Sequence, residues 1–465
     1  MEGLESSLIK NIEEPTDFDK LSINYAFERS FQVLNDKVPD SHSDMTIPPI
    51  EHYEKIIKAF DESRLDDLKK YLDEFSTYIF KNGFDDVEEF YNTRFESVLQ
   101  TLCSSVSQVQ LAQSAFHIIT LLQSKGPAYP MSLLSFDFMN FCVEFVNHQF
   151  SPVLYFALCC LYNICSQSEQ LRDALLEMVP LTKIQSFLSH FDLCVREAAI
   201  DLACCYSKFP LNEEQCITLI AIAQKGLSLG DPKLHHSCYW ILIRILRNVP
   251  QLTENIMAPE ILSFASDIFD DEESYNLIPG MIFISYIYEM NHEIPDLSLN
   301  ALLNLLGDTT DQMCQRQIYR TISKIVYRRP DYVHDMIKFG IIGQAAFAID
   351  NAKFVDKVQI GLLICNIIQQ DISYACDRII QTKSIALFLT LIEFDDEELT
   401  LAALNCLTNI FNEAETSGRK SLLMKRFNIN DGPEIFSKLE HDENEDIANL
   451  SRNFRENYLK QTEEE

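Results

Sequence analysis

The sequence predicts an all-α solenoid, in which helical repeats stack one after another around a shared core. One apolar pattern on helical segments returns about every 41 residues along most of the chain. Glycine and proline are scarce, at 12 and 16 of 465 residues, and long apolar-periodic segments with few breakers are typical of helices. Hydrophobic residues make up 47% of the chain, enough for one continuous core.

The repeat is marked by one polar or small residue with apolar neighbours two positions before it and one position after it. Asn163, between Leu161 and Ile164, is the first clear marker, and successive markers lie 38 to 43 residues apart. The markers are Asn163, Cys204, Arg244, Tyr286, Lys324, Asn366 and Asn409, with looser copies at Thr77, Thr120 and near Asn453. Repeats of about 40–47 residues built from two or three helices indicate an armadillo or a HEAT solenoid. Such a fold presents a long concave binding surface rather than a catalytic pocket.

Composition divides the chain into three parts. Residues 1–50 hold 10 acidic and 4 basic residues, and they include Pro15, Pro39 and the Pro48-Pro49 turn, so we expect a mostly flexible acidic arm. Residues 51–459 carry the repeats as one elongated solenoid domain. Residues 460–465 form an acidic tail that we expect to be frayed.

Charge narrows the classes of partner. The chain carries 70 Asp and Glu against 38 Lys and Arg, a net charge of −32. Direct binding of nucleic acid needs clustered Lys and Arg for the phosphates, so this class is disfavoured. An acidic surface attracts basic protein segments and also keeps a large protein dispersed, and composition alone does not separate these two uses.

The 14 cysteines lie within apolar helical segments, as at 158–161 and 203–206, where a reduced thiol packs as a small hydrophobe. The chain begins with no basic-then-apolar signal segment, and no stretch approaches 18 uninterrupted apolar residues, so we expect no membrane span. These features favour a reducing compartment, the cytoplasm and nucleus.

The motifs of catalysis are missing from the sequence. It contains no phosphate-binding Gly-rich loop, nucleophile elbow or HExxH helix. His235-His236-x-Cys238 offers metal-ligand residue types, but a zinc site needs four convergent ligands and no second Cys/His pair is near in sequence. We therefore expect no enzyme activity, no metal and no cofactor.

Four segments resemble a known family. Residues 403–415, Ala-Leu-Asn-Cys-Leu-Thr-Asn-Ile-Phe-Asn-Glu-Ala-Glu, and residues 443–447 with the aromatic-rich helix that follows them look like the last two repeats of the importin-alpha family. Residues 320–326 and 239–242 are similar to its central repeats. The family consists of adaptors that carry nuclear proteins bearing basic localisation signals. The resemblance covers about residues 60–460 and implies a right-handed armadillo superhelix of nine or ten repeats.

The resemblance also implies a site. In that family the third helix of each repeat carries a Trp and, four residues later, an Asn on the same face. The Asn side chains hold the backbone of an extended peptide, while the Trp rings form slots for Lys and Arg stems and acidic residues pair with the cationic heads. The groove residues implied here are Asn163, Trp240, Arg244, Tyr286, Asn366 and Asn409.

This sequence departs from the family in two places. Trp is replaced by Cys159, Leu362 and Asn405 before the three asparagines, and Lys208 stands where an Asp would pair with the key lysine of the signal. The first 50 residues are acidic, whereas the family carries there an Arg/Lys-rich segment that binds importin-beta. We expect no recruitment of that carrier by the usual route.

The sequence thus favours a divergent importin-alpha-like adaptor that binds extended basic peptide segments for nuclear import, with nuclear transport factors among its protein partners. Each implied groove residue also has an alternative role. Each Asn could instead satisfy a neighbouring backbone group within the solenoid, and Trp240 could instead belong to the core. Arg244 pairs either with an acidic ligand or with a neighbour such as Asp201. The alternative function is an armadillo scaffold that has lost signal binding and mediates other protein–protein assembly.

Overall fold

A computed structural model of the chain describes residues 48–82, 87–105, 108–124, 131–266, 268, 277–290, 298–308, 312–351, 353–382, 384–394 and 396–459. The predicted arm up to residue 47 and the predicted tail at 460–465 lie outside the described residues. Throughout the described ranges every regular element is a helix, which confirms the all-α prediction. The chain divides after Ile256 into two compact units. The single solenoid over 51–459 stays a prediction.

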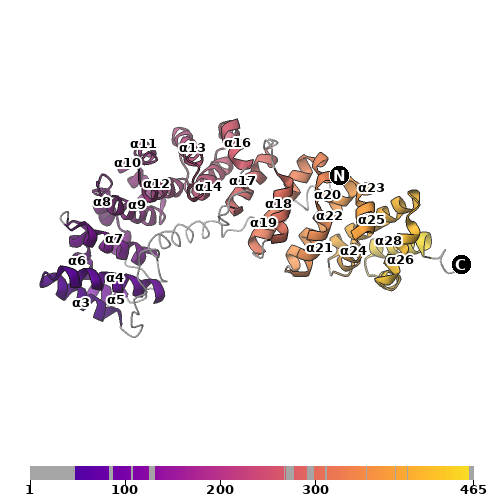
Figure 1. Cartoon of the computed structure of the whole chain (residues 1–465), viewed down its shortest axis with the longest axis horizontal. Coiled ribbons are helices and arrows are strands. Elements are labelled where there is room, and N and C mark those ends of the chain that lie inside the picture. The colour runs from indigo at the N-terminus through magenta and orange to yellow at the C-terminus, as the bar shows by residue number, and fades with distance from the viewer. Residues whose placement is uncertain are drawn as a thin grey trace. The chain divides into compact units, whose positions relative to one another are not determined.

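In the first unit five long helices, α4, α7, α9, α12 and α14, pack in chain order, each against the next (Figure 1). Other helices pack against these five and complete the repeats. The bounds are α3 Pro49–Asp61, α4 Leu65–Asn82, α5 Val87–Asn92, α6 Phe95–Cys103, α7 Val109–Ser124, η1 Met131–Leu134, α8 Phe136–Val143, α9 Ser151–Cys165, α10 Glu169–Met178, α11 Leu181–Phe187, α12 Leu193–Tyr206, α13 Glu213–Ser228, α14 Pro232–Asn248, η2 Pro250–Leu252 and α15 Thr253–Ile256.

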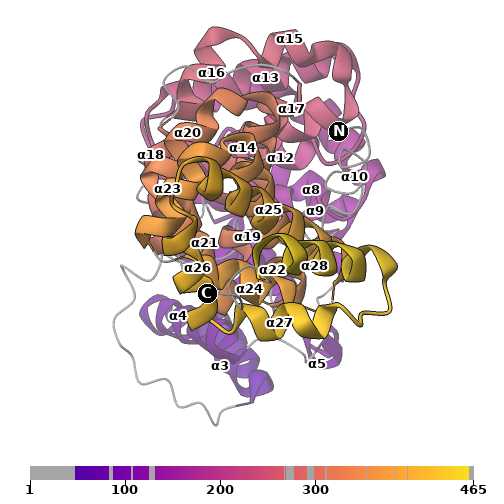
Figure 2. The ribbon, with the colours of Figure 1, turned by 90° about the vertical axis from the view of Figure 1, so that its right-hand side faces the viewer.

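The second unit follows the same plan with α17, α19, α22, α25 and α28. Figure 2 shows α25 beside α28 at its C-terminal end. The bounds are α16 Pro259–Ser266, α17 Leu277–Glu289, α18 Leu299–Asp308, α19 Gln312–Arg328, η5 Pro330–Tyr332, α20 Val333–Phe339, α21 Ile341–Asn351, α22 Phe354–Gln370, α23 Ile372–Thr382, α24 Ile385–Ile392, α25 Glu397–Thr416, α26 Lys420–Ile429, α27 Gly432–Leu439 and α28 Glu445–Tyr458.

In the repeats α10–α11–α12 and α23–α24–α25, two short helices precede one long third helix. This three-helix unit is the armadillo type. Hydrogen bonds between neighbouring repeats join residues about one period apart. The Thr321 hydroxyl donates to the carbonyl oxygen of Met281, 40 residues earlier, and the Ser373 hydroxyl donates to Glu413, 40 residues later. The period predicted from the sequence is therefore visible in the contacts.

Polar residues at the third-helix N-termini set where these helices begin. The Asp192 carboxylate accepts from the backbone N–H of Cys194 at the start of α12, and the Asp396 carboxylate accepts from the N–H of Leu399 in α25. Asp231 caps α14, and Pro232 occupies the first helical position, where its missing N–H costs nothing. These caps fix the direction in which each third helix enters the stack.

Two helical glycines, Gly226 and Gly343, differ in how closely neighbouring side chains pack against them. A Cβ atom at Gly226 in α13 would lie 2.5 Å from the Cys238 sulfur and 2.9 Å from Ile200 Cδ1, whereas one at Gly343 in α21 would meet nothing within 4 Å. We expect Gly226→Ala to destabilise the protein by about 1–3 kcal/mol through overpacking. Gly343→Ala should stabilise it by about 0.5–1 kcal/mol, the usual gain for a helical glycine. Urea denaturation of the two variants checks the opposite signs, and equal shifts would contradict the close packing.

Candidate protein-binding face

The marker residues of the repeats lie on the third helices, and together they define what we call the register face. Its members in the first unit are Asn163 on α9, Cys204 on α12 and Arg244 on α14. Its members in the second unit are Tyr286 on α17, Lys324 on α19, Asn366 on α22 and Asn409 on α25. Cys204 and Arg244 are buried, Asn409 is exposed, and the other four members are half-buried.

Trp240, one turn before Arg244 on α14, is buried, with 3% of its surface exposed. Its indole N–H donates to His236 Nε2 across 3.1 Å, and the guanidinium of Arg244 lies 5.7 Å from the ring centroid. The cation–π contact is therefore made with a residue of the same helix. This arrangement corresponds to the core alternative for Trp240.

Arg244 is also buried, at 7% exposure, and it contacts the last turn of α12 in the preceding repeat. Its Nη1 donates to the carbonyl oxygen of Cys204 across 2.8 Å and to the Ser207 hydroxyl across 3.3 Å. A cation at this end of a helix satisfies a free carbonyl and is favoured by the helix dipole. The Asp201 carboxylate accepts from Ser237 on α14 at 2.5 Å.

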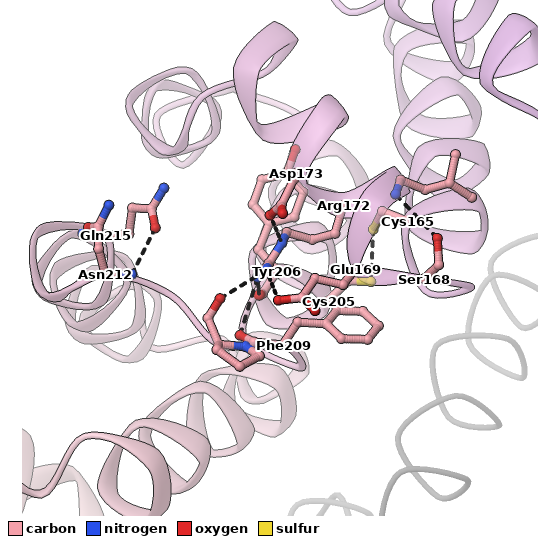
Figure 3. A network of polar contacts seen from close by, with 12 residues as sticks. Cys165, Ser168, Glu169, Arg172, Asp173, Cys205, Tyr206, Phe209, Asn212 and Gln215 are labelled. Atoms are coloured by element: carbon pink, nitrogen blue, oxygen red, sulfur yellow. Dashed lines mark hydrogen bonds and ion pairs between the residues drawn. The ribbon is translucent and has the colours of Figure 1, made fainter.

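A second arginine contacts the same helix end (Figure 3). Arg172 on α10 is 1% exposed, and its Nη1 donates to the carbonyl oxygen of Tyr206 across 2.9 Å. The guanidinium also binds the carbonyl oxygens of Phe209 and Pro210, at 3.2 and 2.9 Å, and its Nε donates to Asp173 at 2.8 Å. Arg172 and Arg244, from two different repeats, thus both donate hydrogen bonds to carbonyl oxygens at the C-terminus of α12.

Lys208, the residue that departs from the family pattern, lies two residues beyond α12. Its Nζ is buried, forms no hydrogen bond with the residues that the structure describes, and lies 5.3 Å from the centroid of the Tyr162 ring. Burial raises the pKa of the Tyr162 hydroxyl, and the nearby cysteines and Asp201 add to that rise. Asn163, the marker of the same helix, donates to Gln123 Oε1 at 3.4 Å. In the first unit, Asn163 and Arg244 therefore contact the preceding repeat, whereas the hydrogen bond of Trp240 stays within α14.

The second unit presents its markers differently. Asn409 on α25 is exposed, Asn366 on α22 is half-buried, and Asn453 on α28, at the looser repeat copy, is exposed. We call these three residues the asparagine ladder. Because α22 packs on α25 and α25 packs on α28, the three side chains recur once per repeat across adjacent helices.

The amide groups of the ladder are available to a partner. Asn366 Oδ1 accepts from Gln370 at 3.2 Å, which leaves its N–H donors without a partner among the described residues. The side chains of Asn409 and Asn453 make no hydrogen bond within those residues either. An amide offers both donor and acceptor groups, the pair needed to bind a peptide backbone.

Further polar groups one turn beyond the ladder were missed by the sequence analysis. Gln370 and Glu413 stand four residues after Asn366 and Asn409, and Glu413 Oε1 accepts from Ser373 at 3.0 Å. Extending the marker pattern by one helical turn would have found both. Tyr286 is half-buried, and Lys324 pairs with Glu289 at 3.2 Å.

Other classes of site can be assessed within the described ranges. No group of three or more His, Cys, Asp or Glu side chains there could hold a metal ion. No described helix has the length and apolarity to cross a bilayer. All 14 cysteines are in the thiol form and 12 of them are buried, as their apolar sequence neighbours predict.

No protein-family model and no curated protein sequence matches the chain. Among solved structures, the chain is similar to an engineered protein from a structural-genomics consortium at TM-score 0.58 and 15% identity, covering 89% of this chain and 99% of that one. It is also similar to a designed armadillo repeat protein in complex with the peptide (KR)4, at TM-score 0.40, 18% identity and coverage of 49% and 97%. A second designed armadillo repeat protein gives TM-score 0.40, 16% identity and coverage of 49% and 98%. The first of these similarities shows a shared fold and nothing beyond the fold.

Proposed function

We propose that the chain is a protein-binding adaptor of the importin-alpha type, in which the asparagine ladder holds the backbone of an extended partner segment. The observation that carries the proposal is the recurrence of Asn366, Asn409 and Asn453 on three adjacent helices with available amide groups. Packed helices lie about 8–10 Å apart, and an extended chain advances about 3.3 Å per residue. Successive ladder asparagines would therefore bind peptide residues that are about three positions apart.

The partner segment that suits this face is basic. Glu413 lies one turn from Asn409, and the whole chain carries a net charge of −32, so the surrounding field attracts Lys and Arg side chains. A basic extended segment is the form of a nuclear localisation signal, so we place the adaptor in nuclear import, between the cytoplasm and the nucleus. The resemblance of residues 403–415 and 443–447 to importin-alpha repeats supports the same setting.

The proposal predicts the behaviour of a double variant, Asn366→Ala with Asn409→Ala. Each lost hydrogen bond contributes about 0.5–1.5 kcal/mol, so a labelled Lys/Arg-rich peptide should bind about tenfold more weakly. Fluorescence anisotropy at physiological salt measures this affinity, with an acidic peptide of scrambled charge as the non-binding control. Circular dichroism of the variant should match that of the unchanged protein.

Asn304→Ala is the matched control, because Asn304 is an exposed asparagine on α18, outside the ladder. It should leave the affinity unchanged. Equal affinity of the double variant and the unchanged protein would refute the ladder. Failure of the basic peptide to bind at all would refute the basic-segment proposal and leave the scaffold function.

The scaffold is the second candidate, and the first unit favours it. Trp240 and Arg244, which would form slots for basic side chains, make contacts within and between repeats instead. On this proposal the chain holds other proteins in an assembly through its repeats, without reading a localisation signal. A variant in which all three ladder asparagines are alanine distinguishes the two functions. A scaffold should still capture its protein partners, whereas an adaptor should lose them.

A further inference from the structure

Two cysteines face each other where α9 packs against α12. Cys165 is the last residue of α9, Cys205 is the penultimate residue of α12, and both are fully buried. The Cys165 thiol donates to the Cys205 sulfur across 2.8 Å, and Figure 3 shows the two sulfur atoms joined by this contact. Because the two helices belong to neighbouring repeats, a bond between these sulfurs would join the repeats covalently.

The chemical surroundings make the two thiols unequal. Burial raises the pKa of the Cys165 thiol. Burial also acts to raise that of Cys205, but the hydrogen bond from Cys165 and the charges of Lys208, Arg244 and Arg172 outweigh it and lower the pKa of Cys205. A thiolate at Cys205 is the nucleophilic form of the residue, beside a second thiol that can complete a disulfide.

Lys208 is one of the cations that act on Cys205, and its own surroundings favour a negative charge nearby. Its Nζ is buried and has no hydrogen-bond acceptor among the described residues. A buried ammonium group without a counter-charge is costly, and the face of the Tyr162 ring is only a weak substitute. The positive charge of Lys208 acts on the Cys205 sulfur and favours its ionised form.

We propose that Cys165 and Cys205 are a redox-active dithiol, which a hydroperoxide converts into a disulfide between neighbouring repeats. The Cys205 thiolate attacks the hydroperoxide, an S–O bond forms as the O–O bond breaks, and the departing oxide takes a proton. The Cys165 sulfur then attacks the Cys205 sulfur; the S–S bond forms, the S–O bond breaks, and hydroxide leaves with the Cys165 proton as water. The two cysteines lose two electrons, and the hydroperoxide gains them. This site is independent of peptide binding.

Other close thiols in the chain serve as internal comparators. Cys365 and Cys406 hydrogen-bond to one another, as do Cys142 and Cys160. The hydrogen bond from its partner and then burial raise the pKa of Cys406, and burial raises that of Cys142, with no cation opposing either rise. The Cys165–Cys205 pair should therefore be oxidised first.

The test treats the reduced full chain with one equivalent of hydrogen peroxide and maps the tryptic peptides without reduction. A Cys165–Cys205 disulfide links peptide 126–172 to peptide 197–208, and the thiol count in denaturant falls by two from 14. Dithiothreitol should reverse both changes. Absence of this link, sulfinic acid at either cysteine, or earlier appearance of the Cys365–Cys406 link would overturn the proposal.

Variants identify the residues involved. Cys205→Ala should abolish the link and Cys204→Ala, a change at the adjacent buried cysteine, should retain it. Lys208→Gln should slow formation of the link several-fold, whereas Lys233→Gln, at an exposed lysine on α14, should not. If Cys205→Ala fails to fold, the peptide map of the unchanged chain still decides. Retention of the link in a folded Cys205→Ala protein, or an unchanged rate in Lys208→Gln, would refute the assigned roles.

Discussion

Arg172→Met is expected to destabilise the first unit by about 3 kcal/mol, because it leaves buried carbonyl oxygens without a donor. The guanidinium binds the carbonyl oxygens of Tyr206, Phe209 and Pro210, where α12 ends and the chain turns toward α13. Methionine replaces the volume of the side chain but donates no hydrogen bond. The loss of the cation also removes a favourable charge at the C-terminus of α12.

The measurement is urea denaturation followed by tryptophan fluorescence, because Trp240, the only tryptophan of the chain, lies in the same unit as Arg172. Arg94→Met is the control: Arg94 is 55% exposed and pairs with Asp61 at the surface, so its loss should change stability by less than about 0.5 kcal/mol. Equal effects of the two substitutions would show that Arg172 does not stabilise the end of α12.

The period of the fold could be predicted from the sequence because each repeat packs against the next in the same way. The marker at Cys204 lies 40 residues before the marker at Arg244, and in the structure a hydrogen bond joins these two residues. Likewise, Thr120, a looser marker, contacts Cys160 on the next third helix, 40 residues later. In stacked repeats, residues that are one repeat length apart in the sequence therefore lie next to each other in the structure.

The chemical role of each marker could not be predicted in the same way. Trp240 and Asn405 occupy the same position on their third helices, four residues before a marker, yet Trp240 is 3% exposed and Asn405 is exposed. That difference depends on neighbours such as His236, whose ring accepts from the indole. Arg172 was not singled out at all, because its partners are backbone carbonyls 34 to 38 residues away, which have no sequence signature.

Trp240→Ala should cost about 3–5 kcal/mol of stability, the usual loss for a fully buried large aromatic residue. Trp240→Phe keeps most of the ring and removes the N–H that donates to His236, so it should cost only about 1 kcal/mol. Because both variants lack tryptophan fluorescence, circular dichroism must follow the denaturation. The ratio of the two losses measures how much Trp240 contributes through packing.

Peptide affinity then separates the two roles proposed for this residue. If Trp240 contributes to the core, Trp240→Phe should bind the Lys/Arg-rich peptide as tightly as the unchanged protein, under conditions where both are folded. If instead its ring forms a slot for a basic side chain, the affinity should fall while stability changes little. The burial of the ring and its contact with Arg244 support the first outcome. That result would support peptide recognition on the asparagine ladder of the second unit, since in the first unit Arg244 binds the preceding repeat and Trp240 belongs to the core.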